Sequence, residues 1–145
     1  MDITVRTAQD KDFKSIIQLI NEFALIQKKP ERVSNTAALM AEEKDSFNCL
    51  VAELDGQIVG YAIFFICYYS WIGKSLYLDD LYVSEQYRSH KVGSSLLEKV
   101  IEEAKSKNCK KVRWQVSNWN EKTIDFYRDF GATIGDLEIN CDLAI

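Results

Sequence analysis

Several residues that often mark a function are scarce in this chain of 145 residues. It has one histidine, His90, and one proline, Pro30. A serine–histidine triad would have to use His90, and a histidine-rich metal site is excluded. The four cysteines stand singly, without a C-x-x-C pair, and residues 1–10 lack the pattern of a signal peptide. We therefore expect reduced thiols, a cytoplasmic protein and no metal.

Long apolar runs and an excess of positive charge are also missing. No segment approaches the roughly 18 uninterrupted apolar residues of a membrane span. The 18 basic and 22 acidic residues leave a net charge of −4, which argues against nucleic acid as the main partner. Apolar residues make up 47% of the chain, enough to bury a core. The length suits a single domain spanning residues 1–145, with neither a membrane nor a nucleic-acid partner.

Hydrophobic periodicity predicts alternating strands and helices. Asp10 is the expected N-cap of the first helix, Pro30 ends that stretch, and Asp55-Gly56 predicts a hairpin turn. Strands are predicted at 3–6, 49–54, 58–66, 75–83, 111–116 and 137–145, and helices at about 13–24, 35–43, 93–107 and 121–130. Early antiparallel hairpins followed by strand–helix–strand units predict an α/β fold, with a mixed sheet covered by helices on both faces.

The first candidate site is the junction between a strand and a helix at residues 83–96. A polar loop at 84–91 leads into a helix start with Gly93, Ser94 and Ser95. Free N–H groups and the helix dipole there suit an anion such as a pyrophosphate, although an ordinary helix start would have the same pattern. The G-x-G-x-x-G and G-x-x-x-x-G-K-[ST] patterns are absent, which disfavours dinucleotide-binding and P-loop proteins.

The second candidate is the pair Asp79-Asp80 inside an apolar strand. Adjacent strand residues point to opposite faces, so at least one carboxylate faces a covered side of the sheet. Carboxylates are rarely buried without a partner or a purpose. Catalysis and a structural bond to backbone amides are both open interpretations for either residue.

The third candidate is the segment 119–127. Asn120 is suited to cap a helix and to contact a ligand amide, and Tyr127 shares an apolar stripe with Ile124. An inward tyrosine is more often a core residue than a catalytic one. The remaining aromatic residues are open to a role in the core, a cleft or an interface; they include Tyr68, Tyr69, Trp71, Tyr77 and Tyr82.

Three segments together resemble the GCN5-related N-acetyltransferase (GNAT) family. They are FNCLVAELDGQIVGYAIFF (47–65), SWIGKSLYLDDLYVSEQYR (70–88) and WNEKTIDFYRDFGA (119–132). The similarity runs from the first predicted strand to the last. It is closest to the branch of the spermidine/spermine and thialysine N-acetyltransferases.

The resemblance implies an acetyl-CoA site between two parallel strands. In the family, the pantetheine pairs with one strand and the pyrophosphate rests on the loop that follows it. The implied catalytic residues are Asp79, which helps to take the proton of the amine, and Tyr127, the general acid. The implied acetyl-CoA contacts are Leu81, Tyr82, Val83, Arg88, Ser89, His90, Lys91, Val92, Gly93, Ser94, Asn120, Lys122 and Thr123.

The resemblance also implies the reaction and the acceptor side. Acetyl transfer to a primary amine of a diamine, polyamine or lysine-like amino acid would proceed by direct attack, with no acyl-enzyme. The branch usually forms homodimers. The implied contacts to the amine are Gln27, Trp71, Asp79, Asp80, Trp114 and Gln115.

Three positions depart from the family pattern. Lys91 replaces the first glycine of the R-x-x-G-x-G loop, so we expect weakened or rearranged pyrophosphate binding. Gln27-Lys28 and Tyr69-Ser70 stand where the polyamine-binding branch carries acidic residues, which favours a smaller amine than spermidine. Phe130 stands where an arginine would contact CoA, so that contact is missing or supplied by Arg128. Lys91 also leaves open a non-catalytic CoA-binding module on the same fold, and a protein-interaction domain is a third alternative.

Overall fold

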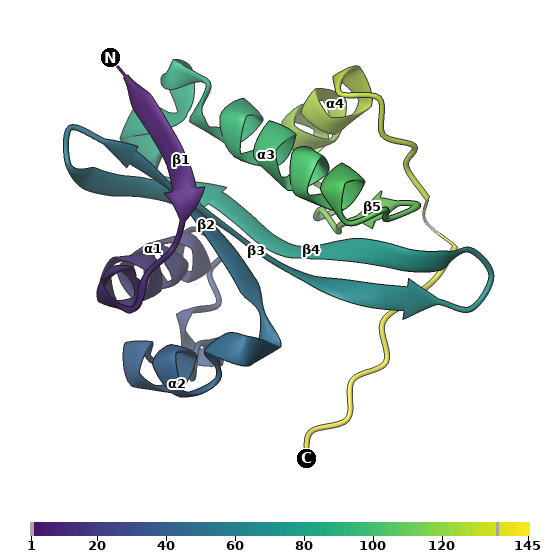
Figure 1. Ribbon diagram of the computed structural model, residues 1–145, viewed down its shortest axis with the longest axis horizontal. Helices are drawn as coiled ribbons and strands as arrows, with labels where there is room; N and C mark the ends of the chain where they lie inside the picture. The colour runs from purple at the N-terminus through teal and green to yellow at the C-terminus, as the bar shows by residue number, and fades with distance from the viewer. Residues whose placement is uncertain (1, 136) are drawn as a thin grey trace. The chain divides into compact units, whose positions relative to one another are not determined.

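A computed structural model describes residues 2–135 and 137–145 (Figure 1). The chain forms two compact units, Met1–Trp114 and Gln115–Ile145. All strands of the described residues belong to the first unit, and the second unit contains one α-helix.

The first unit is built on a five-stranded sheet in the order β1-β2-β3-β4-β5. Neighbours from β1 to β4 pair antiparallel, and β5 pairs parallel to β4. The mixed sheet that the sequence predicts is therefore present. Its strands are β1 (Ile3–Thr7), β2 (Asn48–Leu54), β3 (Gln57–Tyr69), β4 (Gly73–Val83) and β5 (Val112–Arg113).

Helices cover both faces of this sheet, as predicted. The helices α1 (Phe13–Ile26) and α2 (Ala37–Glu42) lie on one face, and α3 (Val92–Ser106) lies on the other (Figure 1). A 3₁₀-helix, Glu85–His90, joins β4 to α3. Thr36 caps α2, because its hydroxyl accepts a hydrogen bond from the Leu39 amide at 3.1 Å.

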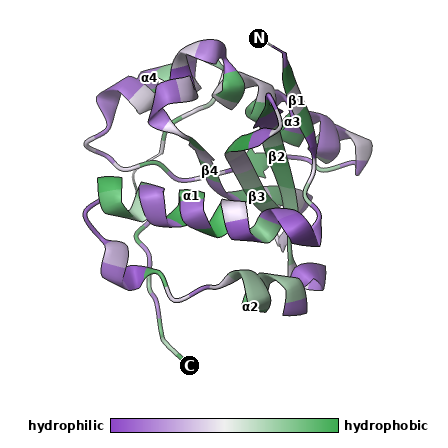
Figure 2. Ribbon diagram, turned by 90° about the vertical axis from the view of Figure 1, so that its left-hand side faces the viewer, coloured by the Kyte–Doolittle hydropathy of each residue, from purple (hydrophilic) through white to green (hydrophobic). Residues whose placement is uncertain are grey.

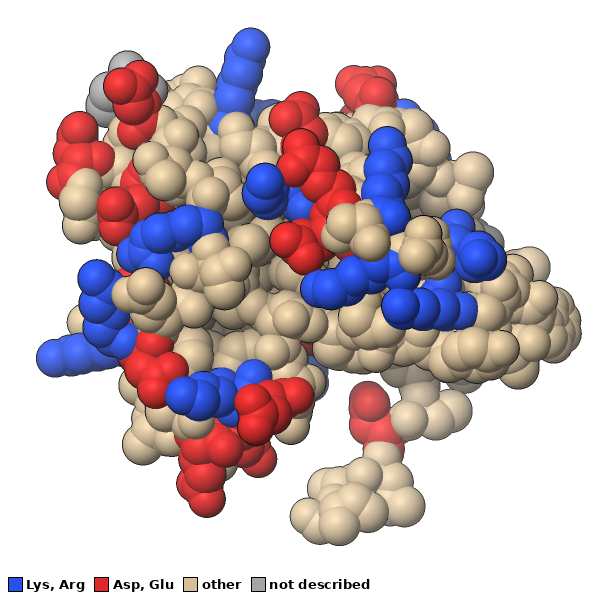
Figure 3. All heavy atoms as spheres, viewed as in Figure 1, with Lys and Arg blue, Asp and Glu red and all other residues tan. Residues whose placement is uncertain are grey.

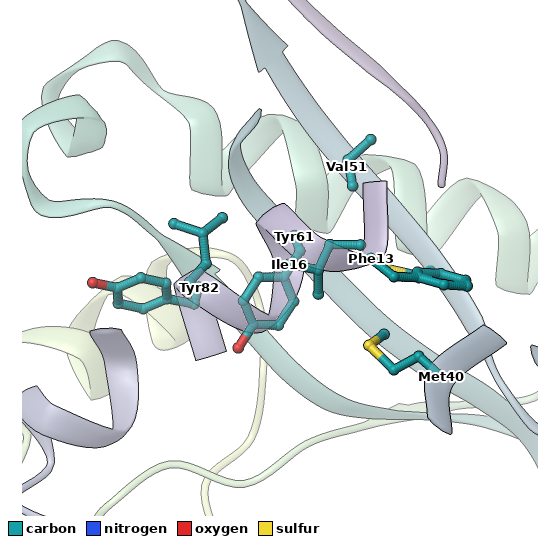
Figure 4. Packing of buried hydrophobic residues seen from close by; sticks show 8 residues of the cluster. Phe13, Ile16, Met40, Val51, Tyr61 and Tyr82 are labelled. Atoms are coloured by element: carbon teal, nitrogen blue, oxygen red, sulfur yellow. The ribbon is translucent and has the colours of Figure 1, made fainter. Parts of the chain in front are cut away.

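Alternation along the strands divides the buried residues between the two helical layers. The apolar strands β2 and β3 contrast with the mixed surface of α1 (Figure 2). Under α1 and α2, Phe13, Ile16, Met40, Val51 and Tyr61 pack into one cluster (Figure 4). On the other face, α3 contributes fully buried side chains to a second layer; they are Val92, Leu96, Leu97 and Val100.

The predicted turn between β2 and β3 is confirmed. Asp55 and Gly56 both have positive φ, 50° and 78°. Such a pair of left-handed residues is typical of the type I′ hairpin, in which aspartate and glycine are favoured.

Four local predictions are wrong. Residues 137–145 form no strand, and the strand expected at 111–116 reduces to Val112–Arg113. An amphipathic strand forms only where a neighbour pairs with it. The loop at 84–91 contains the Glu85–His90 3₁₀-helix. Asp10 does not cap α1, because a 3₁₀ turn at Asp10–Asp12 comes first and α1 begins at Phe13.

The second unit contains α4 (Glu121–Asp129). Asn120 caps the helix, since its side-chain oxygen accepts a hydrogen bond from the Thr123 amide at 3.3 Å. The helix ends before Gly131, whose φ of 101° is the left-handed conformation expected after a helix C-terminus. Both ends of this helix agree with the sequence prediction to within one residue.

The four cysteines are unpaired. Cys49 is buried, and this burial raises the pKa of its thiol to about 12. Across residues 2–135 and 137–145, no helix has both the length and the apolar character needed to cross a membrane. The same residues contain no cluster of three or more histidine, cysteine, aspartate or glutamate side chains suited to a metal.

Candidate functional site

The open edge of β4 is the first feature of the candidate site. The pairing of β4 with β5 covers Leu76 and Tyr77 only. From Leu78 to Val83, the structure describes no strand that pairs with this side of β4. Backbone donors and acceptors on an unpaired edge are available to an extended ligand. The predicted pantetheine contacts, Leu81–Val83, lie within this open stretch.

A β-bulge lies in the middle of the same strand. Ile63 pairs with Asp80, and the next residue, Phe64, pairs with Leu78. Asp79 is therefore the extra residue of the bulge. A bulge bends a strand and changes the aim of its side chains, so the two carboxylates do not follow the simple alternation expected from sequence.

Asp80 has a specific partner that the sequence does not reveal. The hydroxyl of Tyr61 on β3 donates a hydrogen bond to Oδ2 of Asp80 at 2.6 Å. Desolvation raises the pKa of Asp80 to about 6, and the neighbouring charge of Asp79 adds to that rise. Asp80 is half-buried. A carboxyl group with such a pKa can gain and lose a proton near neutral pH.

Asp79 differs from Asp80 in exposure. Its side chain is exposed to water, yet desolvation by the surrounding protein still raises its pKa. The pair thus offers one accessible carboxylate and one held by a tyrosine. Two adjacent acidic groups of this kind attract a cation and can accept a proton from it.

The loop after β4 adopts the backbone conformation that the family glycine permits. Lys91 has φ 59° and ψ 26°, in the left-handed region, and α3 begins at the next residue, Val92. This conformation is strained for a residue with a side chain, whereas glycine adopts it freely. Ser95 does not aim its hydroxyl into the loop, because the hydroxyl donates to the Lys91 carbonyl at 3.0 Å.

Arg88 folds back onto the end of β4. Its Nε donates to the Val83 carbonyl at 3.1 Å, and its guanidinium lies 5.4 Å from the ring centre of Tyr82. This contact fixes the start of the loop against the strand. Arg88 thus has a structural contact in addition to the ligand contact predicted for it.

The side chain of Tyr82 points to the α1 face of the sheet. Its hydroxyl donates to Glu22 of α1 at 2.6 Å, and its ring stacks on Phe23 at 4.8 Å. Burial and the Glu22 carboxylate together raise the pKa of Tyr82. Only its backbone is therefore free for the predicted role at the strand edge. Glu22 is a residue that sequence reasoning missed, since α1 and β4 lie far apart in the chain.

The second unit holds the other predicted catalytic side chain. Tyr127 is the buried residue of α4, and the ring of Phe126 lies 5.4 Å from it. The first turn of the same helix carries the remaining predicted cofactor contacts, Lys122 and Thr123. The Asn120 side chain is engaged as the helix cap.

The predicted amine contacts lie in different places. Gln27 follows the last residue of α1, and Trp71, 97% exposed, lies at the turn between β3 and β4. Asp79 lies six residue steps along β4 from Gly73, about 20 Å at 3.3 Å per step. Trp71 and Asp79 of one chain are therefore not brought together. Trp114 ends the first unit, and in the second Gln115 donates to Asn140 at 2.9 Å.

Comparison with known proteins identifies the class to which this fold and site belong. The acetyltransferase (GNAT) family matches residues 13–132. Thialysine N-epsilon-acetyltransferase of Sus scrofa is 35% identical over 142 residues, covering 90% of this chain and 84% of the relative. The human spermidine/spermine N(1)-acetyltransferase-like protein 1 is 31% identical, over 88% of this chain and 20% of that protein.

Solved structures agree with the fold. An aminoglycoside acetyltransferase from an uncultured soil sample superposes with a TM-score of 0.81 at 18% identity, over 99% of this chain and 96% of that one. The chain belongs to the acetyltransferase (GNAT) family, an enzyme family of N-acetyltransferases. The branch predicted from the three sequence segments is confirmed by the thialysine and spermidine/spermine relatives.

Proposed function

We propose that this protein transfers an acetyl group from acetyl-CoA to a primary amine of a small molecule, by direct attack and without an acyl-enzyme. The observation that carries the proposal is the pair Asp79-Asp80 at a bulge in β4, beside the open edge of that strand. The family membership supports the reaction type. The relatives named for thialysine and for spermidine/spermine support an amine acceptor.

The residues of the first unit fit acetyl-CoA as co-substrate. An open strand edge at Leu81–Val83 suits an extended arm with amide groups, and the start of α3 suits a pyrophosphate. Lys91 adds a positive charge there. We assign the pyrophosphate contacts to residues 88–94 and further contacts to Asn120, Lys122 and Thr123. Acetyl-CoA supplies an activated thioester carbonyl.

The carboxylates and a tyrosine would handle the protons. An alkyl amine has a pKa of about 10.4 and must lose a proton before it attacks. Asp79 and Asp80 would attract the ammonium group and accept that proton, directly or through water. Tyr127 would protonate the leaving thiolate; a free tyrosine has a pKa of about 10 and the thiol of CoA resembles cysteine at about 8.5, so transfer in that direction is plausible for these residue types.

The acceptor is proposed to be smaller than a polyamine. Gln27 and Lys28 follow α1, and Tyr69 and Ser70 lie at the β3–β4 turn, where carboxylates would bind a long polycation. Arg113 lies 4.5 Å from the ring centre of Tyr69 and adds positive charge there. A lysine-like amino acid or a short diamine therefore suits this protein better than spermidine does.

A second candidate function is a non-catalytic CoA-binding module. Lys91 supports it, because a left-handed lysine is strained where the family has glycine. This alternative predicts CoA binding in calorimetry without turnover. Acetylation of any amine by the purified chain would exclude it.

The test of the proposed function uses the purified chain, acetyl-CoA and a panel of lysine-like amino acids, short diamines and spermidine. Released CoA is measured with a thiol reagent. We expect turnover with at least one short amine, and a loss of about 10²-fold or more in Asp79→Asn, as for a lost general base. An absence of CoA release across the whole panel would overturn the proposal.

Two further properties belong to this proposal. We infer a homodimer, as the branch predicts, and large apolar side chains exposed at the β3–β4 turn support it. In Figure 3, the end of this hairpin shows neither red nor blue atoms. The four unpaired thiols support a reducing, cytoplasmic setting.

A further inference from the structure

The hydrogen bond between Tyr61 and Asp80 joins two adjacent strands inside the first unit. The phenol donates to Oδ2 of the carboxylate at 2.6 Å, and the Tyr61 side chain is 0% exposed. Its ring packs in the cluster that contains Phe13 and Ile16, below α1 (Figure 4). A ring enclosed in this way has little freedom to move, so its hydroxyl is a fixed donor.

The bulge explains why Asp80 needs such a donor. Tyr61 pairs with Tyr82, Ile63 pairs with Asp80, and Asp79 is left without a partner on β3. Strand geometry alone therefore does not hold the carboxylates of the bulge in one orientation. The short bond from Tyr61 fixes one oxygen of Asp80, Oδ2.

The surroundings of this bond shift the pKa of Asp80 in opposite directions. Burial and the charge of Asp79 raise the pKa of Asp80, whereas the bonds from Tyr61 and the Leu81 backbone lower it. The pKa of Tyr61 is itself raised by burial, with Cys49 of β2 among the nearby groups. Tyr61 therefore remains a neutral donor at any pH near neutral.

Other ionisable groups on this face have different partners. Glu22, from α1, accepts hydrogen bonds from Tyr82 at 2.6 Å and Ser84 at 3.5 Å. From α2, Met40 contributes an uncharged side chain to the same cluster. Tyr61, in contrast, donates its hydrogen bond to Asp80, and this bond stabilises the ionised form of the carboxyl group.

We propose that Tyr61 is a positioning residue, which holds Asp80 ionised and in one orientation beside Asp79 so that a cationic amine meets a fixed carboxylate. Tyr61 acts through Asp80 and does not itself touch the amine. The inference rests on the proposed function for its kinetic consequence. Its effect on the pKa of Asp80 can be measured without any acetylation.

The kinetic test compares Tyr61→Phe with the wild type from pH 5.5 to 9, using an amine accepted in the panel. The amine ionises to the same extent in both assays at a given pH, so the ratio of the two kcat/KM values does not depend on the protonation of the amine. If the lost bond raises the pKa of Asp80 by about one unit, the variant is about fivefold slower at pH 6 and within about twofold at pH 8 and above. A ratio that does not change with pH would overturn the proposal.

A matched control removes a hydroxyl elsewhere. Tyr87→Phe deletes a phenol that lies 3.4 Å from Gln57, and its ratio to the wild type is expected to stay flat with pH. Replacing Tyr61 with 3-fluorotyrosine strengthens the hydrogen-bond donor and keeps the ring. The pKa of Asp80 should then fall, so the acid limb of the plot of kcat/KM against pH should move to lower pH. This second substitution also tests the proposal should Tyr61→Phe fail to fold.

The direct test follows the Asp80 carboxyl carbon by NMR in protein labelled with ¹³C at the aspartate side chains, and Asp80→Asn assigns its signal. The midpoint of titration should rise in Tyr61→Phe and remain unchanged in Tyr87→Phe. An unchanged midpoint in Tyr61→Phe would overturn the role of Tyr61. Failure of the wild type to acetylate any amine would instead overturn the proposed function, while the titration still reports on Tyr61.

Discussion

At the residue scale, Tyr127 carries the sharpest prediction for the chemistry. It is 8% exposed on α4, and its ring contacts Phe126. Tyr127→Phe keeps the ring and removes the proton, so turnover should fall by roughly 10²–10⁴-fold, the range for a lost general acid. Tyr68→Phe, at a side chain 77% exposed, should keep the wild-type rate. A Tyr127→Phe enzyme as fast as the wild type would show that another group is the acid.

Asp12 carries a prediction for stability. Its buried carboxylate accepts bonds from Arg6 at 2.7 and 3.0 Å and from the Gln9 amide at 2.7 Å. The bond from Arg6 is the main cause that lowers the pKa of Asp12. A lowered pKa in the folded state means that the stabilisation is present at neutral pH and is lost as pH falls below the unfolded value of about 4.

The expected effect of Asp12→Asn is a loss of about 2 kcal/mol in the free energy of unfolding at pH 7, as for hydrogen bonds to a charged group. Urea denaturation from pH 3 to 7 should show the difference from the wild type shrinking towards acid pH. Asp10→Asn is the control, because the pair of Asp10 with Lys44 is exposed at 3.3 Å and worth little. A difference that stays constant with pH would contradict the role of the Asp12 charge.

The sequence indicated a candidate site residue where the residue type was unusual for the segment around it. Asp79 and Asp80 are conspicuous in an apolar strand, and Lys91 departs from a glycine pattern. Tyr61 was not predictable as a partner of Asp80. The two residues are 19 positions apart, and their pairing depends on a bulge that alternation does not reveal.

At the scale of elements, the start of α3 combines a predicted ligand contact with backbone strain. Lys91 is left-handed, a conformation that costs a non-glycine residue roughly 1 kcal/mol. Lys91→Ala removes the charge and keeps that cost, whereas Lys91→Gly removes both. The pair of variants therefore separates the effect of the charge from that of the backbone.

Lys91→Ala is expected to bind CoA about two- to fivefold more weakly than the wild type, with a smaller dependence on salt, since one charge near a helix N-terminus is lost. Lys91→Gly loses the same charge but regains the loop conformation of the family glycine, so its affinity for CoA should exceed that of Lys91→Ala. Lys91→Gly should melt at a higher temperature than Lys91→Ala. Calorimetry at two salt concentrations and thermal melting provide the measurements. Wild-type affinity in both variants would mean that Lys91 does not contact the pyrophosphate.

Elements were predictable where the periodicity was long and a turn was well marked. The β2–β3 hairpin follows from Asp55-Gly56, and α3 follows from its apolar stripe to within one residue at each end. The short β5 strand was overestimated, because Val112–Arg113 is paired only where it meets Leu76 and Tyr77 of β4. Where pairing stops depends on the partner strand and cannot be read from one segment.

At the scale of the whole molecule, the mixed sheet with helices on both faces followed from the order of elements, while the state of residues 137–145 did not. Leu137, Ile139, Leu143 and Ile145 occupy alternate positions of the segment, with polar residues at 138, 140 and 142, and each is at least 86% exposed. Such alternation is typical of a strand with one apolar face. The segment has the pattern of a strand without the neighbour that would pair with it.

A second copy of the chain is the neighbour that we expect. An exposed segment with an apolar face buries that face by pairing, and the proposed homodimer would provide the surface. Size-exclusion chromatography with light scattering should give twice the 16.7 kDa of one chain. The double variant Ile139→Asp, Leu143→Asp should shift the mass towards that of a monomer, because two charges would then lie in the interface.

Leu25→Asp, at an exposed leucine of α1, should leave the dimer intact. A wild-type protein that remains monomeric at 100-fold higher concentration than the assay would contradict the dimer, and a double variant that stays dimeric would move the interface away from residues 137–145.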